Sequence, residues 1–241
     1  LKNFKKALQI YLNLYGEDYP YVADQYNNIG NIFFGQEKFS EANDYYYKAL
    51  KIKKKYHGEN SPEVALVYGN IASTMDRMFK FNEAISYMKK SYEIYKTKYG
   101  ENHPELAHIF FLIGNTLSRQ SKYQESLENH LTALEMQKNY YGNDSPHLTE
   151  NYISCGKVSE QLANYDESYK SYARALELHL NAVGENIKTV QIYKRLALLL
   201  FDAHKTEEAL SFADKAMETC RKVSHKGGED QQCAECLEIL A

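Results

Sequence analysis

The amino-acid sequence predicts an all-α fold, a right-handed helical solenoid of about five helix–turn–helix repeats of 42 residues with partial elements at both ends. Three observations lead to this prediction. Glycines recur every 42 residues, all four prolines follow these glycines at a constant distance, and the apolar residues in between are spaced three, four and seven apart. A fixed period of this length is the sequence signature of stacked structural repeats.

The recurring turn combines a glycine, an Asp or Asn, and a proline. The glycines are Gly16, Gly58, Gly100, Gly142 and Gly184, and the prolines, four residues after the first four of them, are Pro20, Pro62, Pro104 and Pro146. Glycine permits positive φ, Asp and Asn bond to the local backbone, and proline fits the first helical turn, where its missing N–H is no loss. The segment therefore predicts a turn that leads into a helix, with Ser61 and Ser145 as N-caps.

Each proline opens a first helix with one apolar face. The aromatic position is held by Tyr26, Tyr68, Phe110 and Tyr152, the next core position by Ile29, Ile71, Ile113 and Cys155, and the small position after it by Gly30, Ala72, Gly114 and Gly156. These spacings mark one side of an α-helix. The small residue allows another helix to approach closely.

A second helix follows in every repeat. It begins at Phe39, Phe81, Tyr123 and Tyr165, and its inner face carries Tyr46, Met88, His130 and Tyr172 and then Ala49, Ser91, Ala133 and Ala175. The fifth unit keeps this pattern after a one-residue deletion, with Ala209, Ala213 and Ala216. We expect the Lys48–Lys55 run to be the exposed side of such a helix, with docking onto an acidic surface such as a microtubule as the alternative.

The repeat register predicts one continuous domain that begins in the middle of a repeat. We expect residues 1–14 to be the second helix of a truncated preceding repeat of a longer protein. The five repeats then span residues 15–57, 58–99, 100–141, 142–183 and 184–226, and residues 227–241 form a linker and a capping helix.

The pattern of aromatic, Leu or Ile, Gly or Ala, aromatic, then Ala, aromatic and Ala resembles the tetratricopeptide repeat (TPR), with Tyr or Phe where that family usually has Trp. The unit is about eight residues longer than the usual ~34, and the extra length lies around Tyr99–Glu105. This variant is similar to the kinesin light chain type, which is also found in ciliary and signalling scaffolds. The resemblance implies that the first helices line a concave groove and the second helices a convex side.

Composition excludes several functional classes. The formal net charge is −3, with 29 basic and 32 acidic side chains, which favours neither nucleic acid nor an anionic membrane. No Ser/His/Asp or Cys/His set has the spacing of a nucleophilic site, and no Gly-rich phosphate loop exists, so we expect no enzyme activity and no cofactor.

Cys233 and Cys236 form a C-x-x-C motif near Cys220 and His225. We favour half-buried thiols there over a zinc site.

The groove-facing positions are those that remain after the core face is assigned. We assign the partner-binding groove to Asn27, Asn31, Asn70, Arg77, Phe111, Asn115, Arg119, Ile153 and Lys157. Asparagine amides can pair with both the C=O and the N–H of an extended backbone. In the fifth repeat the same positions are assigned to Leu196 and Leu199. Together with Leu198, Leu200 and Phe201 they make this helix apolar nearly all round, so we expect a second surface to cover it.

These features predict a protein-interaction scaffold or adaptor that binds a peptide or helical segment of another protein in its concave groove. The alternative is a structural component of a cytoskeletal or ciliary (axonemal) assembly, docked through its convex face and edges. The expected partners are other proteins, with cytoskeletal or motor components among them, and neither nucleic acid nor a membrane. The expected location is the cytoplasm, with cytoskeletal or ciliary association under the alternative.

Overall fold

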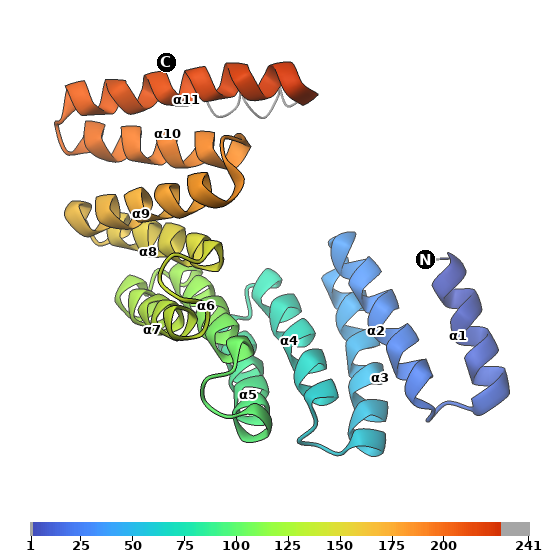
Figure 1. The fold of residues 1–241 in the computed structure, drawn as a ribbon. Helices are drawn as coiled ribbons and strands as arrows, with labels where there is room; N and C mark the ends of the chain where they lie inside the picture. Colours follow the sequence, from blue (N-terminus) through green and yellow to red (C-terminus); the bar gives the residue numbers. More distant parts are fainter. Residues whose placement is uncertain (1, 228–241) are drawn as a thin grey trace. The chain divides into compact units, whose positions relative to one another are not determined.

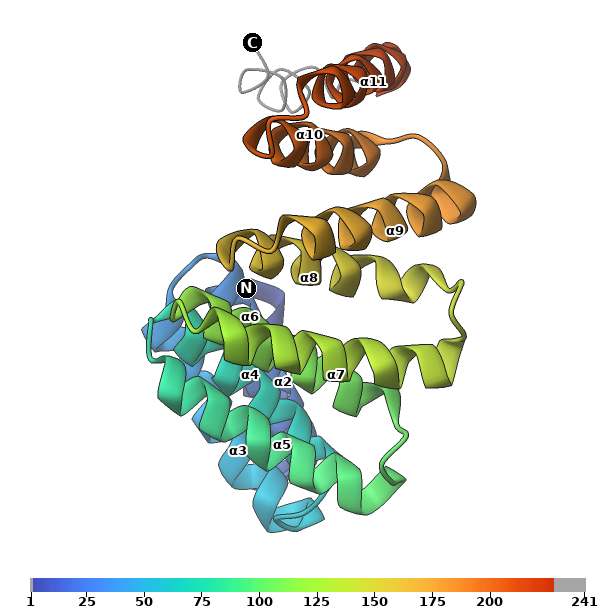
Figure 2. The ribbon, with the colours of Figure 1, turned by 90° about the vertical axis from the view of Figure 1, so that its left-hand side faces the viewer.

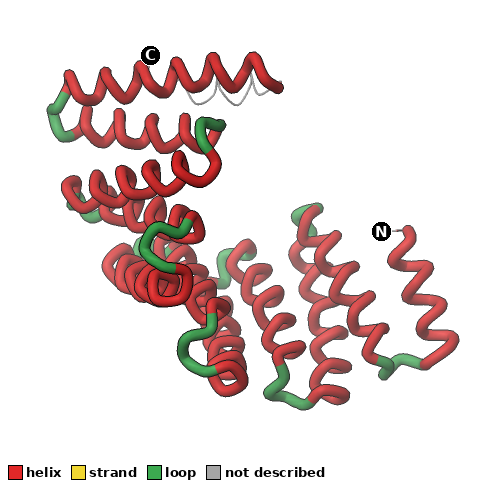
Figure 3. The backbone as a smooth tube through the Cα atoms, viewed as in Figure 1, coloured by secondary structure: helices red, strands yellow, loops and turns green. Residues whose placement is uncertain are grey.

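The computed structural model describes residues 2–227, and these residues form eleven α-helices and no strand (Figures 1 and 3). The helices are α1 (Lys2–Tyr15), α2 (Pro20–Gly35), α3 (Phe39–His57), α4 (Pro62–Arg77), α5 (Phe81–Tyr99), α6 (Pro104–Arg119), α7 (Tyr123–Tyr141), α8 (Thr149–Gln161), α9 (Tyr165–Val183), α10 (Ile187–Asp202) and α11 (Thr206–Gly227). A short 3₁₀ helix, Pro146–Leu148, precedes α8. The predicted all-α class is confirmed.

The chain divides into two compact units, residues 1–120 and 121–241. In the first unit α2 packs against α3 and α4 against α5, while α3·α4 and α5·α6 contacts join successive pairs. In the second unit α8 packs against α9 and α10 against α11, with α7·α8 and α9·α10 contacts between them. Figure 2 shows α7 to α11 following one another in chain order. Each helix therefore packs mainly on its neighbours in sequence, as expected for stacked repeats.

The turns between repeats have the geometry that their residues dictate. Gly58 ends α3 with φ +85° and Gly100 ends α5 with φ +82°, in the region that glycine adopts without steric cost. Ser61 caps α4, since the Val64 N–H donates to its Oγ at 3.3 Å, and Pro62 occupies the first turn. Within each repeat, the two helices are joined by one residue with positive φ that is not glycine, at Glu37, Phe79, Ser121, Ala163 and His204.

The fifth repeat has a different register from the one its glycine suggests. Helix α10 begins at Ile187, one position earlier than the repeat period counted from Pro146 predicts, and His204 follows Ala163 at the same shortened spacing. The deletion thus lies in the turn before α10, where Asn186 replaces the Ser-Pro cap and bonds to the N–H groups of Lys188 and Thr189 at 2.9 and 3.3 Å. Every position in α10 shifts by one, which places Tyr193, Leu196 and Ala197 at the core positions.

The assignment of Leu196 and Leu199 to the groove is therefore wrong. Their exposed fractions are 0% and 1%, because α10 lies against both α9 and α11. The expected need for a separate covering surface disappears with this assignment. Leu200 is also buried, whereas Phe201 is 64% exposed. The expected capping helix, with Cys233 and Cys236, lies outside the described residues.

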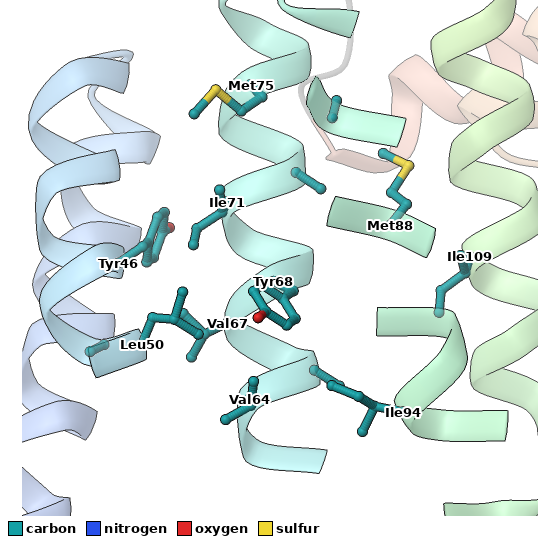
Figure 4. Packing of buried hydrophobic residues seen from close by; sticks show 14 of the residues in the cluster. Tyr46, Leu50, Val64, Val67, Tyr68, Ile71, Met75, Met88, Ile94 and Ile109 are labelled. Carbon is teal, nitrogen blue, oxygen red and sulfur yellow. The ribbon is translucent and has the colours of Figure 1, made fainter. Parts of the chain in front are cut away.

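The core of the first unit runs continuously from α2 to α6. Figure 4 shows Tyr46 and Leu50 of α3 pointing toward Val67 and Ile71 of α4, so the second helix of one pair packs on the first helix of the next. Gly30 matters because a Cβ there would lie 2.6 Å from the ring of Tyr46. The small position of the repeat is thus the site where a tyrosine ring lies on a helix backbone.

The lysine-rich segment of α3 is only partly a solvated face. Lys51 and Lys55 are exposed, as expected. Lys53 differs, since its side chain is 12% exposed and its Nζ lies 2.6 Å from Oδ1 of Asp24 in α2. The prediction was wrong for Lys53 because the long aliphatic stem lies along the adjacent helix before the charge reaches its partner.

Among the described residues, no helix is long and apolar enough to cross a bilayer.

Candidate partner-binding surfaces

The predicted groove residues lie on the first helices of both units. Asn27 and Asn31 lie on α2, Asn70 and Arg77 on α4, and Phe111, Asn115 and Arg119 on α6, all in the first unit, whereas Ile153 and Lys157 lie on α8 in the second unit. They therefore contribute to one candidate surface in each unit.

The asparagine amides of the first unit are oriented by contacts within the protein. Asn70 Nδ2 donates to Asn27 Oδ1 at 2.7 Å, joining α4 to α2. The Tyr46 hydroxyl donates to Asn31 Oδ1 at 2.8 Å, and burial raises the pKa of Tyr46 to about 12, so this donor stays protonated. The side-chain oxygen of Asn70, Oδ1, and the side-chain nitrogens of Asn27 and Asn31, Nδ2, form no hydrogen bond in the described part of the chain. One acceptor and two donors are left for a ligand.

The two arginines hold successive repeats together. Arg77 Nη2 lies 3.1 Å from Glu37 Oε1, and its guanidinium lies 5.3 Å from the Phe39 ring. Arg119 pairs with Asp76 and lies over the rings of Phe79 and Phe81 at 5.3 Å. Each arginine reaches back to the preceding repeat. Their charge is therefore largely neutralised by protein carboxylates, which the sequence pattern did not reveal.

A groove of about 700 Å³ lies between α4, α5 and α6. It is lined by Pro62, Glu63, Ala65, Leu66, Gly69, Asn70, Ser73, Ser91, Tyr95, Tyr99, His103, Glu105, His108, Ile109 and Leu112. Of the predicted residues only Asn70 borders it directly. Phe111 lies beside it on α6, with its ring 6.3 Å from that of His108, and Asn115 is half-buried one turn further along α6.

The wall formed by α5 and the following turn was missed by the sequence analysis. Tyr95 and Tyr99 lie one helical turn apart, and the Tyr99 ring stacks on His103 at 4.4 Å. Burial raises the pKa of Tyr95, so its hydroxyl remains a neutral hydrogen-bonding group. The signal was present as aromatic residues at i and i+4 near the end of the second helix. It was overlooked because only first helices were expected to line the groove.

Two leucines give this groove an apolar part. Leu66 on α4 is 52% exposed and Leu112 on α6 is half-buried, and both line the groove. Glu63 and Glu105 lie at the ends where α4 and α6 begin, and hydrogen bonding of the Glu63 carboxylate to its own backbone N–H lowers its pKa. The groove thus combines apolar side chains, amides and aromatic rings with two carboxylates. It contains no arrangement of nucleophile and base.

The second unit has a smaller pocket of about 320 Å³ between α8, α9 and α10. Its lining residues are Ile153, Lys157, Tyr172, Lys188, Gln191, Ile192, Lys194, Arg195 and Leu198. Both predicted residues of this unit, Ile153 and Lys157, are among them. Within the described residues no group of three or more His, Cys, Asp or Glu side chains is arranged to hold a metal ion.

Paired helices that recur at a constant period and expose a polar and aromatic groove define a helical-repeat protein of the interaction type. The tetratricopeptide repeat profile matches residues 1–55, 26–97, 63–139 and 152–222. The chain therefore belongs to the tetratricopeptide repeat family. No curated protein sequence matches it significantly.

Solved structures with the same fold include kinesin light chain-type proteins. BtubC (BKLC) from P. vanneervenii aligns with a TM-score of 0.76 at 16% identity over 90% of this chain and 87% of that one. A Podosopora anserina kinesin light chain with nearly identical TPR-like repeats gives a TM-score of 0.72 at 12% identity, covering 85% and 97%. A Rap protein complexed with competence and sporulation factor gives 0.63 at 17% identity, covering 99% and 72%. The predicted resemblance to the kinesin light chain type is confirmed at the level of fold.

Proposed function

We propose that the chain is a protein-interaction scaffold that binds an extended segment of a partner protein in the groove between α4, α5 and α6. Family membership supports an interaction scaffold in general, and the Rap protein in complex is an example of this fold with a bound factor. The observation that carries the finer proposal is the groove itself, about 700 Å³ in volume and lined by Asn70, Leu66, Leu112 and Tyr99. That volume is within the range of binding sites.

The groove chemistry suits an extended backbone better than a charged tail. Because Asn27 holds the Asn70 amide, the side-chain Oδ1 of Asn70 is positioned to accept a backbone N–H of the partner without further loss of side-chain entropy. Apolar partner side chains would cover Leu66 and Leu112, and the rings of Tyr95 and Tyr99 offer a flat surface for an aromatic or proline residue. A basic partner residue would be favoured near Glu63 and Glu105.

Peptide display on the purified chain, followed by affinity measurement with a selected peptide, tests this proposal. Leu112→Asp should weaken binding at least about tenfold, because it places a carboxylate in the apolar side of the groove. Asn70→Ala removes one net hydrogen bond and should weaken binding about fivefold. Phe111→Asp should act like Leu112→Asp if the peptide extends along α6.

Matched controls lie on α7, none of whose residues lines this groove. Leu131 is 50% exposed and Asn139 is exposed, so Leu131→Asp and Asn139→Ala should leave affinity within about twofold. Unchanged affinity in both Leu112→Asp and Asn70→Ala would exclude the groove. If no short peptide binds at all, a structural role in a cytoskeletal or ciliary assembly, docked through the convex face and edges, becomes the better explanation.

A further inference from the structure

The pocket between α8, α9 and α10 is a basic site, unlike the groove of the first unit. Four cationic side chains border it: Lys157 from α8 and Lys188, Lys194 and Arg195 from α10. Ile153, Ile192 and Leu198 supply its apolar part, and Gln191 adds an amide. At about 320 Å³, the pocket is sized for one or two side chains of a ligand.

The corrected register explains why these residues meet. After the one-residue shift, Gln191, Lys194, Arg195 and Leu198 occupy the repeat positions that Leu66, Gly69, Asn70 and Ser73 hold on α4. On α8, Ile153 and Lys157 hold the positions of Gly69 and Ser73. The same repeat positions that form an uncharged groove wall on α4 thus carry three cations on α8 and α10.

The carboxylates near the pocket are already engaged. Glu150 pairs with Lys188. Glu160 accepts a hydrogen bond from the Tyr172 hydroxyl at 2.5 Å, and the Tyr172 ring is fully buried against Gly156. In contrast, Lys157, Lys194 and Arg195 form no ion pair within the described residues. The pocket therefore has an excess of positive charge.

This excess charge is held at an energetic cost. Packing of protein atoms around Lys157 lowers its pKa by disfavouring the charged form, and the charge of Arg195 lowers it further, with Glu160 opposing both. Lys157 is nevertheless an exposed residue, so a ligand can reach its side chain. An anion placed between Lys157 and Arg195 would relieve their mutual repulsion and form charge-assisted hydrogen bonds.

We propose that this lysine–arginine pocket binds an anionic side chain of a partner peptide, with a phosphomonoester preferred over a carboxylate. A phosphoserine carries about −1.5 to −2 charges and three acceptor oxygens, which matches three cations better than the single charge of Glu or Asp. The apolar residues Ile153 and Leu198 would contact the atoms next to the charged group. The inference rests on the proposed function only in that a peptide carries the anion.

Isothermal titration with three pentapeptides, Gly-Ala-X-Ala-Gly with X as phosphoserine, glutamate or serine, tests the pocket directly. We expect affinity to fall in the order phosphoserine, glutamate, serine, and inorganic phosphate to compete with the phosphoserine peptide. Arg195→Ala and Lys157→Ala should each weaken phosphoserine-peptide binding at least about tenfold, because each variant loses one charge-assisted hydrogen bond to the phosphate. Both side chains are exposed enough for the variants to fold.

Lys205→Ala is the matched control, because Lys205 is an exposed cation of the same unit that does not border the pocket. It should leave the affinity within about twofold. Equal loss in Lys205→Ala and Arg195→Ala, equal binding of the serine and phosphoserine peptides, or binding of inorganic phosphate but of no peptide would overturn the proposal. Leu112→Asp should not affect this titration, so failure of the groove and failure of the pocket are distinguishable.

Discussion

His130 of α7 is a fully buried imidazole at a repeat position that otherwise holds Tyr46, Met88 and Tyr172. Burial lowers its pKa to about 4, and a hydrogen bond with Asn151 opposes this shift only in part. The residue is a packing element that is also titratable, so it should affect stability and not chemistry.

We expect His130 to make the protein less stable in mild acid. Between the unfolded value of about 6.5 and the folded value of about 4, only the unfolded state binds the proton. The free energy of unfolding should therefore fall as pH decreases through this window, by about 3 kcal/mol in total from this group. Urea melts between pH 7 and 4 measure the effect.

His130→Met is the appropriate comparison, because Met88 already occupies the same position in the second repeat. The acid loss in this variant should be smaller by the His130 contribution. Parallel pH profiles for the wild type and His130→Met would show that the imidazole is protonated in the folded state as readily as in the unfolded one.

At the scale of the helix pair, the residue at the small position of the first helix varies together with the residue that faces it on the second helix. Gly30 faces Tyr46 and Gly156 faces Tyr172, with an added Cβ at 2.6 and 2.8 Å from the nearest ring atom. In the second repeat Ala72 is the small residue and Met88 stands at the tyrosine position, and both are buried. A flexible thioether can move aside for a methyl group, whereas a tyrosine ring lying on the backbone cannot.

A double-mutant cycle tests this dependence. Gly30→Ala alone should cost about 1–3 kcal/mol through overpacking against Tyr46. Combined with Tyr46→Met it reproduces the Ala72–Met88 pair, and the loss in the double variant should fall short of the summed single losses by about 0.5 kcal/mol or more. Gly69→Ala is the matched control, since nothing lies within 4 Å of a Cβ there, and it should stabilise the protein by about 0.5–1 kcal/mol. Additive losses would mean that the two positions are independent.

At the scale of the whole molecule, the period and chemistry of the turns are sufficient to predict the helices. Gly58, Pro62 and their equivalents fix where each helix ends and begins, because these backbone requirements are local. Side-chain partners are not local. Nothing in the sequence shows that Arg119 turns back to Asp76 and Phe79, or that Lys53 reaches Asp24.

The sequence predicts the residues of the candidate sites only in those repeats whose register it also predicts correctly. The Asn27–Asn70 contact joins residues of neighbouring first helices whose repeat positions differ by one, 11 and 12 residues after Gly16 and Gly58. The basic pocket could not be predicted in this way. Gly184 keeps the glycine period, but the one-residue deletion that follows Gly184 shifts α10 by one position. A one-residue shift rotates a helix by ~100°, enough to exchange buried leucines for Lys194 and Arg195. Tyr193 and Ala197, spaced as the aromatic and small residues of the other repeats, carried the signal.

Because each helix packs mainly on its sequence neighbours, stability should be a local property of the repeats. Gly156→Ala forces α8 away from Tyr172 of α9 at an expected cost of about 1–3 kcal/mol. Amide hydrogen exchange should then accelerate about 5- to 150-fold in α8 and α9. This factor is the same free-energy cost converted into a change in the equilibrium constant for local opening. Exchange in α2 to α5 should stay within about twofold of the wild type. Equal acceleration in all helices would instead mean that the chain opens as a single cooperative unit, in which case strain in one helix pair would be shared by every repeat.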